Sequence, residues 1–152
     1  SLIPTLTVMQ NVMLGKEESR AGFVSARKMR KRVSELINKY GFGIKPDAIV
    51  ETLTIAQRQT IEILKALSEE SKLIIMDEPT ASLSTKESDA LFGIIEQLRK
   101  DGVSVIYISH RLEEVYRLAD RLTVLRDGAR EATLTKEQII HAEVVRLMIG
   151  KE

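Results

Sequence analysis

The sequence predicts an α/β fold in which parallel strands alternate with helices. Two short, continuous apolar runs, residues 73–76 and 103–108, are typical of strands buried on both faces of a parallel sheet. Residues 84–102 lie between these runs and have the apolar spacing of a helix, so the three segments form a strand-helix-strand unit. Residues 1–70 read as further helices, which predicts a helical part ahead of the sheet.

The composition excludes several classes of protein. With 152 residues and 43% hydrophobic content, the chain suits one domain or part of one. Lysine and arginine total 23 against 22 for aspartate and glutamate, so no global charge attracts nucleic acid or an anionic membrane. The sequence has no cysteine, hence no disulfide or thiolate zinc site, and no apolar run near the ~20 residues that span a bilayer.

Two helices are predicted in the first 40 residues. Thr7 and Gln10 form a capping-box pattern, and Gly15 stands where that helix ends. A loop through Gly22 follows, and residues 25–40 then form an amphipathic helix. The apolar stripe of this helix consists of Met29, Val33, Leu36, Ile37 and Tyr40.

The opposite face of residues 25–40 is basic. It carries Arg27, Lys28, Arg30, Lys31 and Arg32. These cations are consistent with a nucleic-acid patch or with a solvated helix face. Because no aromatic residues interleave with them, we favour the solvated face.

The remaining elements follow in order. A helix over residues 54–67 starts at a capping box of Thr54 and Gln57, and the helix at 84–102 starts at Ser84 and Glu87. Beyond the second apolar run, residues 112–119 predict a short helix and residues 122–125 a strand. Further along, the Asp127-Gly128 pair predicts a hairpin turn, and Thr135 with Gln138 predicts a last helix that ends at Gly150.

Polar residues end both predicted strands. Asp77 and Glu78 follow the first, and Ser109 and His110 follow the second. Ligands bind outside the carboxyl ends of parallel strands, so we expect these side chains to share one edge of the sheet. Two adjacent carboxylates can divide their work between a magnesium shell and an attacking water, while a histidine hydrogen-bonds a terminal phosphate. The alternative to this catalytic interpretation is a structural role, in which the two acids cap the turn before Pro79 and His110 caps its own helix.

A phosphate-binding loop is not found in the sequence. Such a loop needs glycines followed by Lys and Ser or Thr, and none of the eight glycines has that spacing. The two Gly-Lys pairs, at residues 15–16 and 150–151, are both followed by glutamate. The chain also starts without methionine and almost directly on a helix signal, so we expect it to begin inside a domain.

These motifs resemble those of ABC-type ATPases. Residues 73–80 resemble the Walker B segment, and residues 108–110 resemble the switch histidine. Residues 53–57 stand in the place of the family signature, and residues 81–84 in that of the loop that contacts the opposite ATPase domain. The resemblance covers nearly the whole chain. Residues 109–115 most resemble the first half of the tandem ATPase subunits of bacterial monosaccharide importers of the ribose, galactose and xylose types.

The resemblance implies a role for each matching residue. Asp77 would support Mg²⁺, Glu78 would polarise the attacking water, and His110 would sense the terminal phosphate of ATP. The residues implied to face ATP held by a partner half are Thr54, Ile55, Ala56, Gln57 and Ser84. A plain capping box remains the alternative for Thr54 and Gln57.

This sequence departs from the family pattern at three positions. The signature usually has glycines where Ile55 and Ala56 stand, and side chains there limit how closely backbone approaches phosphate. The following loop usually has aspartate where Ser84 stands. We therefore expect slower hydrolysis at the composite site that uses this signature.

The resemblance also implies an architecture, in which the phosphate-binding loop and its strand lie upstream of Ser1. It predicts an incomplete P-loop NTPase (RecA-like) core plus an ABC-type helical subdomain, divided into residues 1–70 (helical subdomain with signature), 71–135 (partial ATPase core) and 136–152 (C-terminal helix). The implied partners are transmembrane permease subunits and a second ATPase half, at the cytoplasmic face of the membrane. Without the first strands of the core we expect the isolated chain to be inactive and to self-associate through exposed apolar sheet surface.

Two other functions stay open at this point. One is a soluble ABC-type ATPase acting on nucleic acid or ribosomes, which only the basic helix face supports. The other is a non-catalytic interaction fragment whose helical part docks on a partner. We expect no nucleic-acid partner, because the composition offers no wider basic surface.

Overall fold

A computed structural model describes residues 2–15, 19–20 and 23–150 of the chain. The chain divides into two compact units, Ser1–Ile108 and Ser109–Glu152. The subdivision by function into residues 1–70, 71–135 and 136–152 stays a prediction. Among the described residues, none of the helices is both long enough and apolar enough to cross a membrane.

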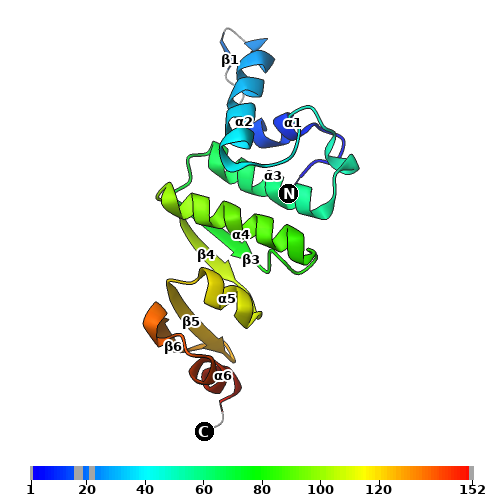
Figure 1. Cartoon of the computed structure of the whole chain (residues 1–152). Coiled ribbons are helices and arrows are strands. Elements are labelled where there is room, and N and C mark those ends of the chain that lie inside the picture. Colours follow the sequence, from blue (N-terminus) through cyan, green and yellow to red (C-terminus); the bar gives the residue numbers. More distant parts are fainter. Residues whose placement is uncertain (1, 16–18, 21–22, 151–152) are drawn as a thin grey trace. The chain divides into compact units, whose positions relative to one another are not determined.

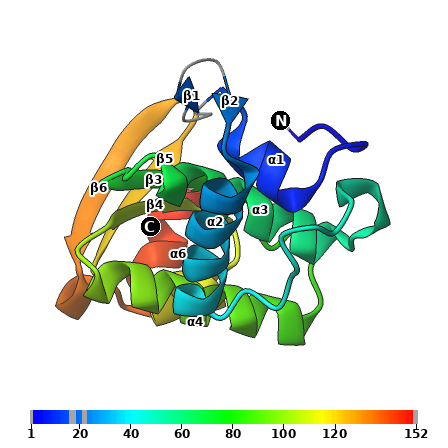
Figure 2. The same cartoon turned by 90° about the horizontal axis from the view of Figure 1, so that it is seen from above.

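The first unit begins with a group of helices. They are α1 (Val8–Met13), α2 (Ala26–Tyr40), the short 3-10 helix η1 (Val50–Thr52) and α3 (Ile55–Ser68). Figures 1 and 2 both show α1, α2 and α3 side by side. The predicted capping boxes at Thr7 and Thr54 are present, and Gly41 ends α2 at a positive φ of 67°. Local sequence signals therefore place the helix ends correctly.

Asn11 fixes the start of the chain against α1. Its side chain is 2% exposed. The amide oxygen accepts from the Ile3 backbone N–H at 2.7 Å, and the amide nitrogen donates to the carbonyl oxygens of Ile3 and Thr7, each at 3.0 Å. A buried amide that satisfies backbone groups in this way orders the segment ahead of the helix.

We expect Asn11→Ala to lower the free energy of unfolding by about 2 kcal/mol, because it removes the hydrogen bonds that this buried side chain makes to the backbone of Ile3 and Thr7. Chemical denaturation of the two proteins measures this. Asn38→Ala, at an exposed position of α2, is the control and should change stability little. Equal losses for both variants would contradict the expectation.

Residues 19–20 and 23–24 form a short strand pair in the segment before α2, where a loop through Gly22 was predicted. Strand β1 (Ser19–Arg20) pairs antiparallel with β2 (Phe23–Val24). The loop prediction is wrong here because strands of two residues are too short to show an alternating pattern in sequence. Gly22, where that loop was expected to end, lies outside the described residues.

The predicted strand-helix-strand unit is confirmed. Strand β3 (Leu73–Asp77) pairs in parallel with β4 (Ser104–Ile108), and α4 (Thr85–Lys100) connects them. The register places Leu73 opposite Ser104 and Asp77 opposite Ile108. Helix α4 packs on β4 (Figure 1). Between them, the Phe92 and Tyr107 rings lie edge to face, with centroids 6.5 Å apart.

The prediction that both strands are buried on two faces is wrong. In β3, Ile74 and Met76 are buried, but Leu73 and Ile75 are 49% and 62% exposed. In β4, Ile106 and Ile108 are exposed as well. Successive side chains of a strand point to opposite faces, so only one face of this pair of strands is covered. The sequence shows that both faces of these strands are apolar, but it does not show which other segments pack against each face.

A carboxylate at the end of α4 ties the helical group to the strands. Asp101 accepts a hydrogen bond from Tyr40 Oη at 2.8 Å and pairs with Lys39 Nζ at 2.8 Å, both from the end of α2. Gln97 Nε2 donates to its other oxygen at 3.1 Å. The hydrogen bond from Lys39 holds the pKa of Asp101 below its ordinary value. This contact joins residues 61 positions apart in the chain.

The second unit contains α5 (Leu112–Leu118), β5 (Arg121–Arg126), β6 (Ala129–Thr135), the 3-10 helix η2 (Lys136–Gln138) and α6 (His141–Ile149). Strands β5 and β6 form the predicted antiparallel hairpin. Asp127 and Gly128 both have positive φ, 51° and 76°, as a tight hairpin turn requires.

The last helix starts later than predicted. The capping box of Thr135 and Gln138 is present, but it caps the short η2. The backbone is then extended at Ile140 (φ −103°, ψ 135°), so α6 begins at His141. A capping box marks where a helix can start and does not determine how far it continues.

Candidate functional site

Asp77 and Glu78 lie where two parallel strands end together. Asp77 is the last residue of β3 and is paired in register with Ile108, the last residue of β4. The backbone N–H of Glu78 donates to the Ile108 carbonyl at 2.9 Å, which extends the ladder by one bond. The predicted shared edge is therefore confirmed for the acids and the end of β4.

Glu78 has an unusual backbone conformation. Its φ is 45°, in the left-handed region that favours glycine. The chain turns there: Ala81 N donates to the Glu78 carbonyl at 3.1 Å and Leu83 N to the Thr80 carbonyl at 3.0 Å. Backbone carbonyls thus close the turn, and the capping alternative for the two carboxylates stays open. Strain of this kind costs about 1–3 kcal/mol and concentrates at functional positions.

The two acids have different surroundings. Asp77 is exposed, whereas Glu78 is half-buried and its Oε2 atom is shielded from solvent. Beneath the turn, Thr80 is 1% exposed. One carboxylate is therefore open to solvent and the other is held against the fold, as a division of labour between them requires.

The donor set fits a magnesium ion that shares its ligands with a nucleotide. Mg²⁺ keeps several waters and takes one or two carboxylates plus phosphate oxygens. Asp77 offers one exposed carboxylate at the strand end. Among the described residues, no group of three or more His, Cys, Asp or Glu side chains could hold a metal by itself. Water and nucleotide oxygens would fill the other positions of the magnesium shell.

His110 follows β4 by two residues, is exposed and belongs to the second unit. The N-cap of α5 is Arg111, so the alternative in which His110 caps its own helix is wrong. The position of the imidazole relative to Asp77 and Glu78 stays a prediction.

Residues 54–57 form the start of α3. Thr54 Oγ1 accepts from Gln57 N at 3.2 Å, and Gln57 Oε1 accepts from Thr54 N at 3.0 Å, so the capping box is confirmed. The first helical hydrogen bond is donated by Arg58, which places the amides of Ile55 and Ala56 ahead of it. Ile55 is 60% exposed. The capping box and a phosphate-facing role are compatible, and the second stays a prediction.

Ser84 is the N-cap of α4. Its hydroxyl donates to Glu87 Oε2 at 2.7 Å, and its backbone N–H donates to the same oxygen at 2.9 Å. These two hydrogen bonds lower the pKa of Glu87. The hydroxyl of Ser84 therefore caps its own helix, and its contact with a nucleotide stays a prediction.

Sequence reasoning missed Glu114. This carboxylate is on α5 and only 4% exposed. It accepts from Ser109 Oγ at 2.8 Å and pairs with Arg111 at 2.9 Å. Glu114 lies one turn before the buried Leu118, so an acid on an apolar helix face was the available signal.

The basic face of α2 is largely neutralised by acids of the same unit. Arg30 pairs with Asp47, Lys31 with Glu35, and Arg32 with Glu70. Arg32 also donates to the Ser68 carbonyl at 3.0 Å. Since the cations alternate with carboxylates, the surface favours the solvated-face interpretation over a nucleic-acid patch.

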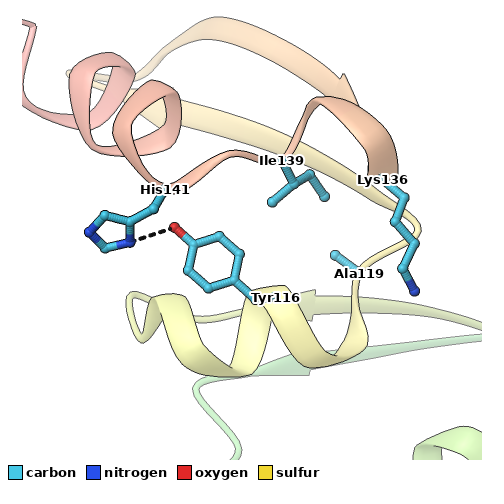
Figure 3. A pocket seen from close by; sticks show the side chains of 5 residues that line it. All are labelled: Tyr116, Ala119, Lys136, Ile139 and His141. Atoms are coloured by element: carbon cyan, nitrogen blue, oxygen red, sulfur yellow. Dashed lines mark hydrogen bonds between the residues drawn. The ribbon is translucent and has the colours of Figure 1, made fainter.

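A shallow pocket in the second unit does not involve the predicted residues. Its lining consists of Tyr116, Ala119, Lys136, Ile139 and His141 (Figure 3). The Tyr116 hydroxyl and His141 Nδ1 lie 3.1 Å apart at one end. Neither group belongs to the strand-end chemistry, so we give this pocket no role in it.

The fold matches solved ATP-binding cassettes. One is a dimeric cassette in a post-hydrolysis state bound to ADP and inorganic phosphate, with a TM-score of 0.73 and 26% identity, matching 90% of this chain and 59% of that one. A nucleotide-free cassette from an ABC transporter has a TM-score of 0.75 at 22% identity, over 95% of this chain and 63% of that one. The second match shows the fold alone.

Curated relatives are similar along the whole sequence. The ribose import ATP-binding protein of Rubrobacter xylanophilus is 46% identical over 152 residues, 100% of this chain and 31% of that protein. Its counterpart in Yersinia pestis is 45% identical over 150 residues, 99% of this chain and 30% of that protein. The chain thus spans about a third of the length of these relatives. The family model described as ABC transporter matches residues 1–81, more than half of the chain, which therefore belongs to the ABC transporter family of ATP-binding proteins.

Proposed function

We propose that residues 1–152 work within the nucleotide-binding domain of an ATP-driven monosaccharide importer. ATP binding closes two such domains and hydrolysis reopens them. The observation that carries the proposal is the adjacent pair Asp77 and Glu78 at the end of parallel strands, with Glu78 held at a positive φ. A left-handed position that glycine would occupy more easily carries a carboxylate instead.

The side chains divide the work as follows. Glu78 orients the attacking water and accepts its proton, because its carboxylate is held against the turn. Asp77 occupies one position of the magnesium shell from the exposed end of β3. His110 hydrogen-bonds the terminal phosphate. When bound, Mg²⁺ neutralises charge that develops on the phosphate oxygens.

The start of α3 faces ATP bound by a partner half. Support comes from its exposed first residue and from the amides of Ile55 and Ala56, which precede the first helical hydrogen bond. Helix starts of this kind favour anions. The side chains of Ile55 and Ala56 hold phosphate farther away than glycine would, so hydrolysis at this composite site is slow.

The substrate and partners follow from the relatives. Two of them are ribose import ATP-binding proteins, so the transported molecule is a monosaccharide. The helical group within residues 1–70 docks on transmembrane permease subunits, and the domain sits at the cytoplasmic face of the membrane. Selectivity among sugars is carried by the permease and an external binding protein.

We expect the whole gene product that contains residues 1–152, expressed together with its permease subunits, to copurify with them from detergent extracts. Hydrolysis by the complex should rise when the permease and its sugar-loaded binding protein are present together. The measurement is ATP turnover in lipid vesicles, with and without the loaded binding protein.

The same preparation separates the alternatives. Salt-sensitive RNA binding without permease copurification would contradict the proposal and favour the nucleic-acid hypothesis. Permease binding with turnover that Glu78→Gln leaves unchanged would favour a non-catalytic interaction module.

A further inference from the structure

Glu114 sits directly behind the segment that carries His110. Its side chain is 5% exposed, and both carboxylate oxygens have partners. Oε2 accepts from the Ser109 hydroxyl at 2.8 Å, and Oε1 lies 2.9 Å from Arg111 Nη1. The residues immediately before and after His110 are therefore bound to one carboxylate.

The Ser109 hydroxyl extends this arrangement to the backbone. It accepts from the Arg111 N–H at 3.0 Å while it donates to Glu114. The backbone N–H of Glu114 in turn donates to the Arg111 carbonyl at 3.1 Å. The Ser109 side chain and the Arg111 backbone, on either side of His110, are thus fixed by hydrogen bonds that involve one buried acid.

Burying the Glu114 carboxylate costs free energy, so its partners need an explanation. A buried carboxylate is unfavourable unless it is paired and hydrogen-bonded, and Glu114 is both. Arg111, the N-cap of α5, makes no side-chain hydrogen bond that caps the helix, so the pair is not explained as a helix cap. A buried charge that binds two residues around an exposed histidine is well suited to hold that histidine in one position.

We propose that Glu114 is a positioning residue, which fixes the turn of Ser109 to Arg111 so that the His110 imidazole is held ready for the terminal phosphate. The inference rests on the proposed function, because it acts through His110. It adds Glu114, and through it Ser109 and Arg111, to the residues on which the hydrolysis rate depends.

The test is a double-mutant cycle in the whole gene product. Glu114→Gln should lower kcat roughly ten- to a hundred-fold while nucleotide affinity changes little, because a misplaced group slows chemistry more than binding. In a His110→Ala background the same change should have almost no further effect. A merely structural role would lower kcat by the same factor in both backgrounds and would overturn the inference.

Two variants of Ser109 and a control at Glu113 keep the test decisive if Glu114→Gln folds poorly. Ser109→Ala should lower kcat in the same direction, and Ser109→Thr, which retains the hydroxyl, should restore it. Glu113→Gln changes the exposed neighbouring acid and should leave kcat unchanged. Equal rates for Ser109→Ala and the unaltered protein would overturn the inference alone. A His110→Ala protein with full activity would overturn the proposed role of His110, and the inference with it.

Discussion

Replacing Glu78 with glutamine is expected to lower ATP turnover by the whole gene product about 10²–10⁴-fold. Glutamine has nearly the same size, so it can keep the turn in which the Glu78 carbonyl accepts from Ala81. It cannot accept a proton from water at neutral pH. The change should therefore remove catalysis and preserve nucleotide binding, which steady-state turnover and equilibrium ATP binding measure separately.

Two comparisons make this result specific. Glu96→Gln, at an exposed position of α4, should keep the original rate. Glu78→Gly removes the carboxylate, so this variant should be as inactive as Glu78→Gln. Because glycine adopts a positive φ without strain, its free energy of unfolding should be no lower than that of the unaltered protein. Turnover of Glu78→Gln within a factor of two or so of the unaltered protein would leave the water-activating role without support.

The isolated chain of residues 1–152 is expected to show no magnesium-dependent ATP turnover. None of its eight glycines has the spacing of a phosphate-binding loop, so nothing in the sequence grips the β- and γ-phosphates next to Glu78. Phosphate release with and without Mg²⁺ measures this. Turnover that Glu78→Gln abolishes in the isolated chain would contradict the expectation.

The same preparation should be larger than one chain of 17.1 kDa in light scattering. Leu73, Ile75, Ile106 and Ile108 leave one face of the β3–β4 pair apolar and exposed. Surfaces of this kind drive association. Ile75→Lys is the matched test, since a charge on that face should shift the sample toward monomer. A freely reversible monomer of the unaltered chain would contradict the expected self-association.

Local signals in the sequence were reliable guides to local structure. The capping boxes at Thr7, Thr54 and Ser84 form as predicted, because each involves only groups three residues apart. The Asp127-Gly128 turn also forms, because both residues tolerate positive φ. The strand-helix-strand unit with parallel strands was predictable from the order of apolar patterns.

Predictions failed where the answer depended on distant parts of the chain. The apolar run of β3 indicated burial on both faces, yet Ile75 is 62% exposed. Apolarity shows which faces avoid water and gives no information on which partner covers them. Glu114 was missed for a different reason: its partners Ser109 and Arg111 are close in the chain, but a lone glutamate in a helix usually faces solvent.

The sequence by itself determined the candidate chemistry: carboxylates at 77 and 78 after one strand, a histidine at 110 after the next, and helix starts at 54 and 84. Only the tertiary structure decided the register that sets Asp77 beside Ile108, the left-handed turn at Glu78, and the burial of Glu114 behind the His110 segment. The physical reason is the distance along the chain between the groups that interact. Caps and turns depend on groups within about four residues, whereas register, strain and burial depend on packing between segments far apart in the chain.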